Sequence, residues 1–371
     1  MKGSKLFGAS LVLALAVPAA FFCGSDGASA GGKTTIGQTM PLRDEGMFFV
    51  NGQLVLSNFP NAGSGSTPPT PATFDVNQMF VHYRLPASQK HKVPIIMVHG
   101  GGLTGMTWET TPDGREGWST YFTRQGFDTY IVDFPGRGRA GFNVTPLNQA
   151  KFENNVSLQP SIGRTGIEAA WTTFRFGPTY LTPFPGVQSP QVNPDGSINQ
   201  AAVEQFSAQG VPSAEVTLTP AAATTIPAAI VELLKKVGPA ILMVHSQGGG
   251  FADAAVGLRP DLIKMMIHLE SNCRFGTPFT PAQLDAYKTV PSVLYVHGDN
   301  VVGNPASTGQ PRLTFCMNDT NAINAAGGRA TLVQLPDVGN KGNDHMLMQN
   351  RNNLQVADWV IAESPREGSN H

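Results

Sequence analysis

Short, unbroken runs of apolar residues recur along the chain after residue 90. Such runs predict strands that are buried on both faces, as in a parallel sheet covered by helices. A helical pattern follows one of them at residues 251–258, and another comes last at residues 354–361. The pattern predicts an α/β fold with a mostly parallel central sheet flanked by helices. The predicted strands cover residues 93–98, 127–132, 241–245, 262–269, 291–298 and 330–335.

The patterns that precede this region are weaker. Residues 47–50 and 53–59 flank Gly52 and predict a hairpin. Residues 60–71 are rich in Pro, Gly, Ser and Thr and predict an exposed loop. The partial alternation of residues 74–84 predicts a single early antiparallel strand.

Residues 141–227 have no regular pattern but contain many prolines, few charges and clustered aromatics. An insertion between two central strands predicts a cap that excludes water and shapes an apolar pocket at the sheet edge. The α/β core is then expected at residues 31–140 and 228–371. We expect most of the cap aromatics to form the cap's own core, namely Trp171, Phe174, Phe176, Tyr180, Phe184 and Phe206.

The run at 241–245 ends abruptly at Ser246, Gln247 and three glycines. A strand, a very tight turn and a helix, with a serine at the apex, are typical of a nucleophile elbow. Gly248 fits the full Gly-x-Ser-x-Gly pattern, whereas Val244 stands at the first glycine position. The alternative is an ordinary turn in which Ser246 only caps the helix.

A glycine-rich loop, His-Gly-Gly-Gly-Leu-Thr-Gly, follows the first central strand at residues 99–105. Its backbone N–H groups are free to bind an anion, but no Lys-Ser/Thr follows, which excludes a Walker phosphate loop. We expect Gly101, with Gly102 as second candidate, to donate one hydrogen bond of an oxyanion hole. Gln247, the residue after the serine, would supply the other. The alternative is a plain strand-to-helix turn.

A serine nucleophile needs a base and an acid that orients the base, in the chain order Ser, acid, His. Of the eight histidines, only His345 lies in a loop after the last predicted strand. His245, beside the serine, should point away from it. Glu270 follows one central strand and is the candidate acid; Asp299, after the next, is the alternative. A purely structural Glu270 would instead pair with an arginine such as Arg274.

The order of these motifs resembles that of α/β-hydrolases over residues 93–362, with Asp-Phe-Pro-Gly-Arg-Gly at 133–138 between the glycine loop and the elbow. Residues 99–115 are similar to secreted bacterial esterases typified by an Alcaligenes esterase. The resemblance implies a Ser-Glu-His triad, which favours Glu270, and it implies a homodimer. That esterase carries two adjacent cysteines where this chain has Gly101 and Gly102, so we expect a more mobile loop here.

These features predict a serine carboxylic ester hydrolase that acts on a small-molecule ester through an acyl-enzyme on Ser246. No metal or organic cofactor is expected. The same triad could serve amides, thioesters or polyesters, and a non-catalytic binding module is the alternative of another class. Haloalkane and epoxide chemistry need an aspartate at the elbow apex, where this chain has the serine.

The first thirty residues predict an export signal. Lys2 and Lys5 precede an apolar stretch at 6–22, and small residues at 28–30 suit cleavage after Ala30. The alternative is lipidation of Cys23. The apolar stretch is short for a membrane span, so no stable membrane insertion is expected. The mature protein would be secreted or periplasmic.

Composition refines this picture. Cleavage of the 371-residue chain after residue 30 leaves 341 residues and two cysteines, Cys273 and Cys316. An exported chain with two cysteines predicts one disulfide, with two buried thiols as the alternative. The 25 basic and 26 acidic residues include no basic cluster, which argues against nucleic acid or anionic membrane partners.

Overall fold

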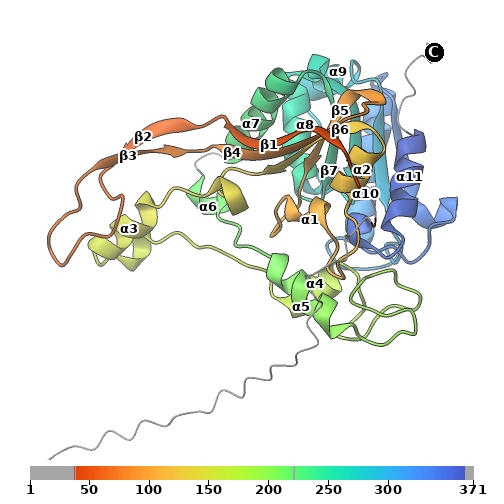
Figure 1. The fold of residues 1–371 in the computed structure, drawn as a ribbon, viewed down its shortest axis with the longest axis horizontal. Helices are drawn as coiled ribbons and strands as arrows, with labels where there is room; N and C mark the ends of the chain where they lie inside the picture. Colours follow the sequence, from red (N-terminus) through yellow and green to blue (C-terminus); the bar gives the residue numbers. More distant parts are fainter. Residues whose placement is uncertain (1–36, 38, 220–221, 364–371) are drawn as a thin grey trace, which may run out of the picture. The chain divides into compact units, whose positions relative to one another are not determined.

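Eight strands form the central sheet (Figure 1), and six neighbouring strands of it, from β6 to β10, run parallel. β1 and β4 are antiparallel, as are β4 and β6, whereas all pairs from β6 through β10 are parallel. The predicted mostly parallel α/β sheet is thus confirmed. Its spatial order is β1 (Leu42–Val50), β4 (Met79–Pro86), β6 (Phe127–Asp133), β5 (His91–Val98), β7 (Ala240–His245), β8 (Ile263–Leu269), β9 (Val293–His297) and β10 (Ala330–Gln334).

The computed structural model describes residues 37, 39–219 and 222–363. The predicted signal peptide at residues 1–30, including Cys23 and the cleavage site after Ala30, lies outside the described residues. Within the described part, no helix is both long and apolar enough to cross a membrane.

Alternate residues of the parallel strands enter two different apolar clusters, one on each face of the sheet. In β5, Ile96 and Val98 join one cluster, and Ile95 and Met97 join the other. The first cluster includes side chains of α7 (Ala222–Val237), α8 (Gly248–Leu258), α9 (Pro281–Tyr287) and α10 (Gln310–Ala325). The second includes those of α1 (Met106–Glu109), α2 (Trp118–Arg124) and α11 (Asn353–Glu363). Helices therefore cover both faces, which explains the continuous apolar runs.

The predicted hairpin at residues 47–59 is wrong. β1 pairs with β4, whereas β2 (Gln53–Ser57) pairs with β3 (Ala72–Val76) in a separate two-stranded sheet. Asn51 and Asn77 have φ of 64° and 63°, and the Asn51 side chain donates to the Asn77 carbonyl. These two left-handed residues interrupt both strands at the same level, so one long ribbon is divided into two paired segments. The single strand expected at 74–84 is divided at Asn77 for the same reason.

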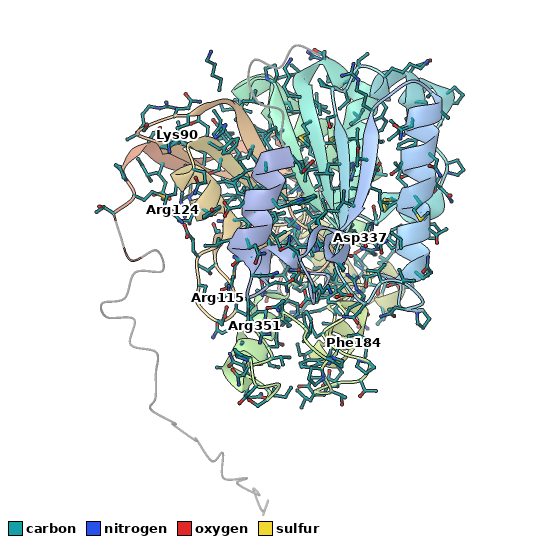
Figure 2. The ribbon with its side chains drawn as sticks, turned by 90° about the vertical axis from the view of Figure 1, so that its right-hand side faces the viewer. Lys90, Arg115, Arg124, Phe184, Asp337 and Arg351 are labelled. Atoms are coloured by element: carbon teal, nitrogen blue, oxygen red, sulfur yellow. A yellow bond between two sulfur atoms is a disulfide. The ribbon has the colours of Figure 1, made fainter. Side chains whose placement is uncertain are left out.

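The segment 141–227 contains α3 (Thr145–Phe152), α4 (Ile167–Thr173), α5 (Gln200–Gln209) and α6 (Glu215–Leu218). In Figure 2, Asp337, just past β10, lies at the end of the sheet nearer to Phe184 of this segment, and Lys90, just before β5, lies at the opposite end. Residues of α4 and α5 line one cavity with Gly101 and Gly102, which follow β5, so these helices also lie at the carboxyl ends of the parallel strands. Trp171, Phe176 and Phe206 are buried in mutual edge contacts, as expected for a core of the segment itself.

Cys273 and Cys316 form a disulfide, as predicted. The bond joins the short helical turn that follows β8 to α10, across a sequence separation of 43 residues. It lies close to the carboxyl end of β8, where Glu270 is found.

Candidate active site

The backbone turn at Ser246 presents the serine at the carboxyl end of β7. Ser246 has φ of 50°, a left-handed conformation that costs energy for a residue with a side chain. The turn is closed by the hydrogen bond from the Gly249 N–H to the Ser246 carbonyl. A Cβ at Gly248 would lie 2.6 Å from the His99 carbonyl oxygen, and one at Gly249 would lie 1.9 Å from Ser271 Oγ. The helix can start this close to its neighbours only because these residues are glycines.

The structure brings Ser246, His345 and Glu270 together. His345 Nε2 lies 3.1 Å from Ser246 Oγ, and His345 Nδ1 lies 3.2 Å from Glu270 Oε2. A carboxylate can only accept, so Nδ1 carries the proton and Nε2 is left to accept from the serine hydroxyl. His345 and Glu270 are fully buried, and Ser246 is 8% exposed.

Glu270 accepts hydrogen bonds from Arg175 and Gly298 in addition to the one from His345. Arg175, just after α4, donates from Nη1 to Oε2 at 3.0 Å and from Nη2 to Oε1 at 2.5 Å. The Gly298 N–H donates to Oε1 at 2.6 Å. Burial alone would raise the pKa of Glu270, but the charge of Arg175 and the nearby rings of His297 and His345 outweigh it and hold the pKa well below its ordinary value. Glu270 is therefore a carboxylate at neutral pH.

His345 is neutral at the same pH. Burial lowers its pKa well below 6.5, the His245 ring and the Arg312 charge lower it further, and Glu270 opposes them. Its backbone N–H donates to the Phe174 carbonyl at 3.0 Å, and the Phe174 ring lies 5.1 Å from the imidazole. On the other side, His245 Nε2 donates to the His345 carbonyl at 3.0 Å. The imidazole is thus fixed from both sides in the form that accepts a proton.

Gly101 and Gln247 lie side by side next to the serine. A Cβ at Gly101 would lie 3.3 Å from Gln247 Oε1. Among the described residues, neither backbone N–H donates to a protein acceptor. Two free donors beside a serine hydroxyl suit an oxyanion.

Arg137 holds the loop that carries Gly101. Its Nη1 donates to the Gly100 carbonyl at 3.3 Å and to the Leu103 carbonyl at 2.9 Å, one on each side of the Gly101–Gly102 pair. Its guanidinium also forms a fully buried ion pair with Glu215 of α6. The loop, expected to be mobile without the adjacent cysteines, is tied at both ends by this arginine.

Asp299 does not contact His345. Its Oδ1 accepts from the Asn300 N–H at 2.7 Å and its Oδ2 from the Gly342 N–H at 2.9 Å, so it supports the loop that follows β10. Arg274, considered as a partner of Glu270, pairs with Asp319 at 2.7 Å instead. The arginine on Glu270 is Arg175.

Sequence reasoning missed three arginines of this site. Arg137 lies in the Asp-Phe-Pro-Gly-Arg-Gly motif, which could have singled it out. Arg175 lies in the irregular segment and carries no sequence signal. Arg312, in the first turn of α10, donates from Nη1 to Ser246 Oγ at 2.9 Å and to the Glu270 carbonyl at 3.0 Å, again without a local signal.

A small cavity lies against the glycine loop. A cavity of about 20 Å³ next to Gly101 is lined by glycines and polar side chains together with Leu103, Ile167, Phe174 and Phe206. In the described part of the chain, no group of three or more His, Cys, Asp or Glu side chains could hold a metal ion.

Comparison with known proteins gives two informative similarities. The chain is 36% identical to a solved structure described as that of a novel bacterial esterase, with a TM-score of 0.78, over 89% of this chain and 98% of that chain. It is 24% identical over 341 residues to the probable secreted lipase phiG of a fungal species (strain ATCC 74256), over 76% of this chain and 84% of the lipase. No protein-family model matches.

Proposed function

We propose that this chain, which belongs with the bacterial esterase to the α/β-hydrolase family, works through an acyl-enzyme on Ser246. It is a carboxylesterase-type hydrolase. His345 is the general base and Glu270 the acid that orients it. The substrate is a small-molecule carboxylic ester. No metal or cofactor enters the proposed reaction.

The proposed acylation starts when His345 Nε2 takes the hydroxyl proton of Ser246 as Oγ attacks the ester carbonyl carbon. The N–H groups of Gly101 and Gln247 donate to the oxyanion of the tetrahedral intermediate. Loss of one such donor typically costs on the order of a hundredfold in rate. The intermediate collapses when the carbon–oxygen bond to the alcohol breaks and His345 returns its proton to the leaving oxygen.

In the proposed deacylation, a water gives a proton to His345 and attacks the acyl carbon. The carbon–Oγ bond then breaks, the carboxylic acid is released, and Oγ recovers its proton from His345. Glu270, anionic in both stages, stabilises the imidazolium that forms each time.

The relay from Glu270 Oε2 to His345 Nδ1 and from His345 Nε2 to Ser246 Oγ is the observation that carries the proposal. Buried polar side chains are costly unless they are fully paired. A binding module would gain nothing from a buried neutral base aligned on a serine beside two free backbone donors. The apolar side chains around the small cavity support an apolar acyl group at this site.

We further propose that residues 141–227 act as the cap, and that the protein is exported after removal of residues 1–30. The disulfide and the similarity to a secreted lipase support export to an oxidising compartment. A homodimer is proposed from the family resemblance, and light scattering of the purified protein would test it.

The function is tested by treating the protein that begins at residue 31 with a fluorophosphonate and mapping the adduct by mass spectrometry. The adduct is expected on Ser246, with turnover of p-nitrophenyl acetate, and both are expected to disappear in Ser246→Ala. A folded wild-type protein with neither labelling nor turnover would refute the catalytic proposal and favour a binding module.

A further inference from the structure

The nucleophile has a second charged neighbour besides the histidine. Arg312 Nη1 lies 2.9 Å from Ser246 Oγ, and the arginine is 5% exposed. We propose that Arg312 is a catalytic residue that donates a hydrogen bond to Ser246 Oγ and stabilises negative charge on that oxygen when it leaves the acyl-enzyme. The inference rests on the proposed triad and adds a residue to it.

The hydrogen bonds at Oγ are mutually compatible. A serine hydroxyl has one proton to donate and two lone pairs to accept with. Oγ donates its proton to His345 Nε2 at 3.1 Å and accepts from Arg312 Nη1 at 2.9 Å. Arg312 thus leaves the nucleophile–base hydrogen bond intact while placing a cationic donor on the reacting atom.

The charge balance of the site points the same way. Glu270 is engaged by Arg175 through both carboxylate oxygens, so its charge is already matched. Arg312 reaches only the Glu270 carbonyl and Ser246 Oγ, and no carboxylate pairs with it among the described residues. A buried cation with no directly bonded carboxylate is costly to keep, and here only the more distant Glu270 charge favours its charged form. Burial lowers the pKa of Arg312 to about 10, which still leaves it charged at neutral pH. A cation maintained at such a cost and directed at the nucleophile is explained by charge that appears there during the reaction.

The reaction step that benefits most is deacylation. When the carbon–Oγ bond of the second intermediate breaks, the electron pair goes to Oγ before or as His345 returns the proton. A preorganised donor aimed at developing charge in a dry site is worth far more than it is in water. In acylation the same hydrogen bond eases removal of the proton but makes the oxygen less nucleophilic, so its two effects oppose each other.

Arg312 also acts on the base. The charged or titratable groups around His345 are Glu270 at the end of β8, His245 on β7, Arg175 after α4, Asp344 next in the chain and Arg312 on α10. A nearby cation disfavours the protonated imidazole. Removing the Arg312 charge therefore raises the pKa of His345. As pH falls, the variant protonates His345 and loses activity at a higher pH than the wild type does.

The fold fixes Arg312 where the proposal needs it. Cys316 follows Arg312 by four residues on α10, so the two side chains project from the same helix face. The disulfide joins Cys316 to Cys273, three residues after Glu270. The register of α10 is thereby locked to the segment that carries the acid.

The test compares Arg312→Met, which removes charge and donor, with Arg312→Lys, which retains the charge. Stopped-flow measurements with p-nitrophenyl acetate separate acylation from deacylation, and kcat/KM is followed from pH 5 to 9. Arg312→Met should slow deacylation by about 10- to 100-fold and give a larger burst. Its acid limb should move to higher pH, and Arg312→Lys should restore the position of that limb. Arg312→Gln replaces Arg312→Met if the latter does not fold.

Arg259→Met is the matched control, because Arg259 pairs with Asp261 at the surface, and it should behave as the wild type. If the wild type labels at Ser246 and turns over ester but the neutral Arg312 variant deacylates at the wild-type rate with an unchanged pH profile, the Arg312 inference is overturned. If the wild type itself neither labels nor turns over, the proposed function has failed instead.

Discussion

Glu270→Gln is the substitution that most directly tests how the site is built. The carboxylate accepts two hydrogen bonds from Arg175, one from the Gly298 N–H and one from His345 Nδ1. A glutamine offers one acceptor oxygen, and its amide group would face a donor wherever it is turned. The change therefore removes the orienting partner of the base and also leaves the Arg175 cation buried without its anion.

Both losses have expected magnitudes. In serine protease triads, replacing the acid with its amide lowers kcat by about 10⁴-fold, because the histidine is no longer held in the required tautomer. Removing one partner of a buried ion pair costs about 3–5 kcal/mol. Glu270→Gln should therefore show a kcat roughly 10⁴-fold lower and a free energy of unfolding lower by a few kcal/mol.

The two effects can be separated with Arg175→Gln and with the double variant. The double variant leaves neither charge unpaired, so it should regain much of the free energy of unfolding in urea titrations, while its kcat for p-nitrophenyl acetate stays as low as that of Glu270→Gln. Asp299→Asn is the control for a carboxylate near the site that does not touch His345, and it should keep most activity. If Glu270→Gln kept more than a tenth of the wild-type kcat while Asp299→Asn lost orders of magnitude, the acid would be misassigned.

Three further changes test other parts of the structure. Burial raises the pKa of Asp344 from 3.8 to about 7, so the folded protein holds a proton that the unfolded chain has released, and stability falls as pH rises from about 4 to 7. Asp344→Asn should therefore stabilise the protein more at pH 7.5 than at pH 4.5 in urea unfolding, and an equal difference at both pH values would contradict this sign. Replacing Cys273 and Cys316 together by serine should lower the free energy of unfolding by about 2–4 kcal/mol. It should also reduce kcat more than it changes KM, because α10 is no longer tied near Glu270. An unchanged kcat would count against the proposed link between the disulfide and Arg312. Arg137→Met frees the carbonyls beside Gly101 and should lower kcat by about 10- to 100-fold. Adding Glu215→Gln should recover stability in thermal unfolding but should not recover kcat. Recovery of kcat in the double variant would show that the glycine loop does not need the hydrogen bonds from Arg137.

The sheet and the order of the site residues were predictable because their signals are local. Each buried strand is a continuous apolar run, and parallel strands present their carboxyl ends at one edge of the sheet. Ser246 follows β7, Glu270 follows β8, and His345 follows β10 in the next loop. Once the strands are assigned, these three side chains must lie near one another at that edge.

The pairing of the early strands was not predictable in the same way. Asn51-Gly52 is a pair that favours a tight hairpin turn, yet here it interrupts a strand. The left-handed Asn51 interrupts a long two-stranded ribbon, and its side chain donates a hydrogen bond to the carbonyl of Asn77 on the opposite strand. Only the partner strand decides between the two uses of the dipeptide.

Arg175 and Arg312 could not be found from the sequence for a related reason. Arg175 meets Glu270 across 95 residues, and Arg312 meets Ser246 across 66. Neither contact leaves a periodic trace, and a lone arginine in a polar helix or an irregular loop is normally solvated. Their burial follows from how α10 and the end of α4 close over the sheet edge, which is a property of the whole fold.

Two buried ion pairs join segment 141–227 to the rest of the protein, and they limit how substrate can enter. Arg137 of the core pairs with Glu215 of the segment, and Arg175 of the segment pairs with Glu270 of the core. Lifting the segment as a rigid lid would separate both pairs and disrupt the triad acid at the moment of binding, at a cost of several kcal/mol for each pair. The space next to Gly101, about 20 Å³, is nevertheless far too small for an ester. We therefore expect substrate to enter by local displacement of the apolar side chains that line this space, while the two ion pairs that position the acid and the oxyanion loop stay formed.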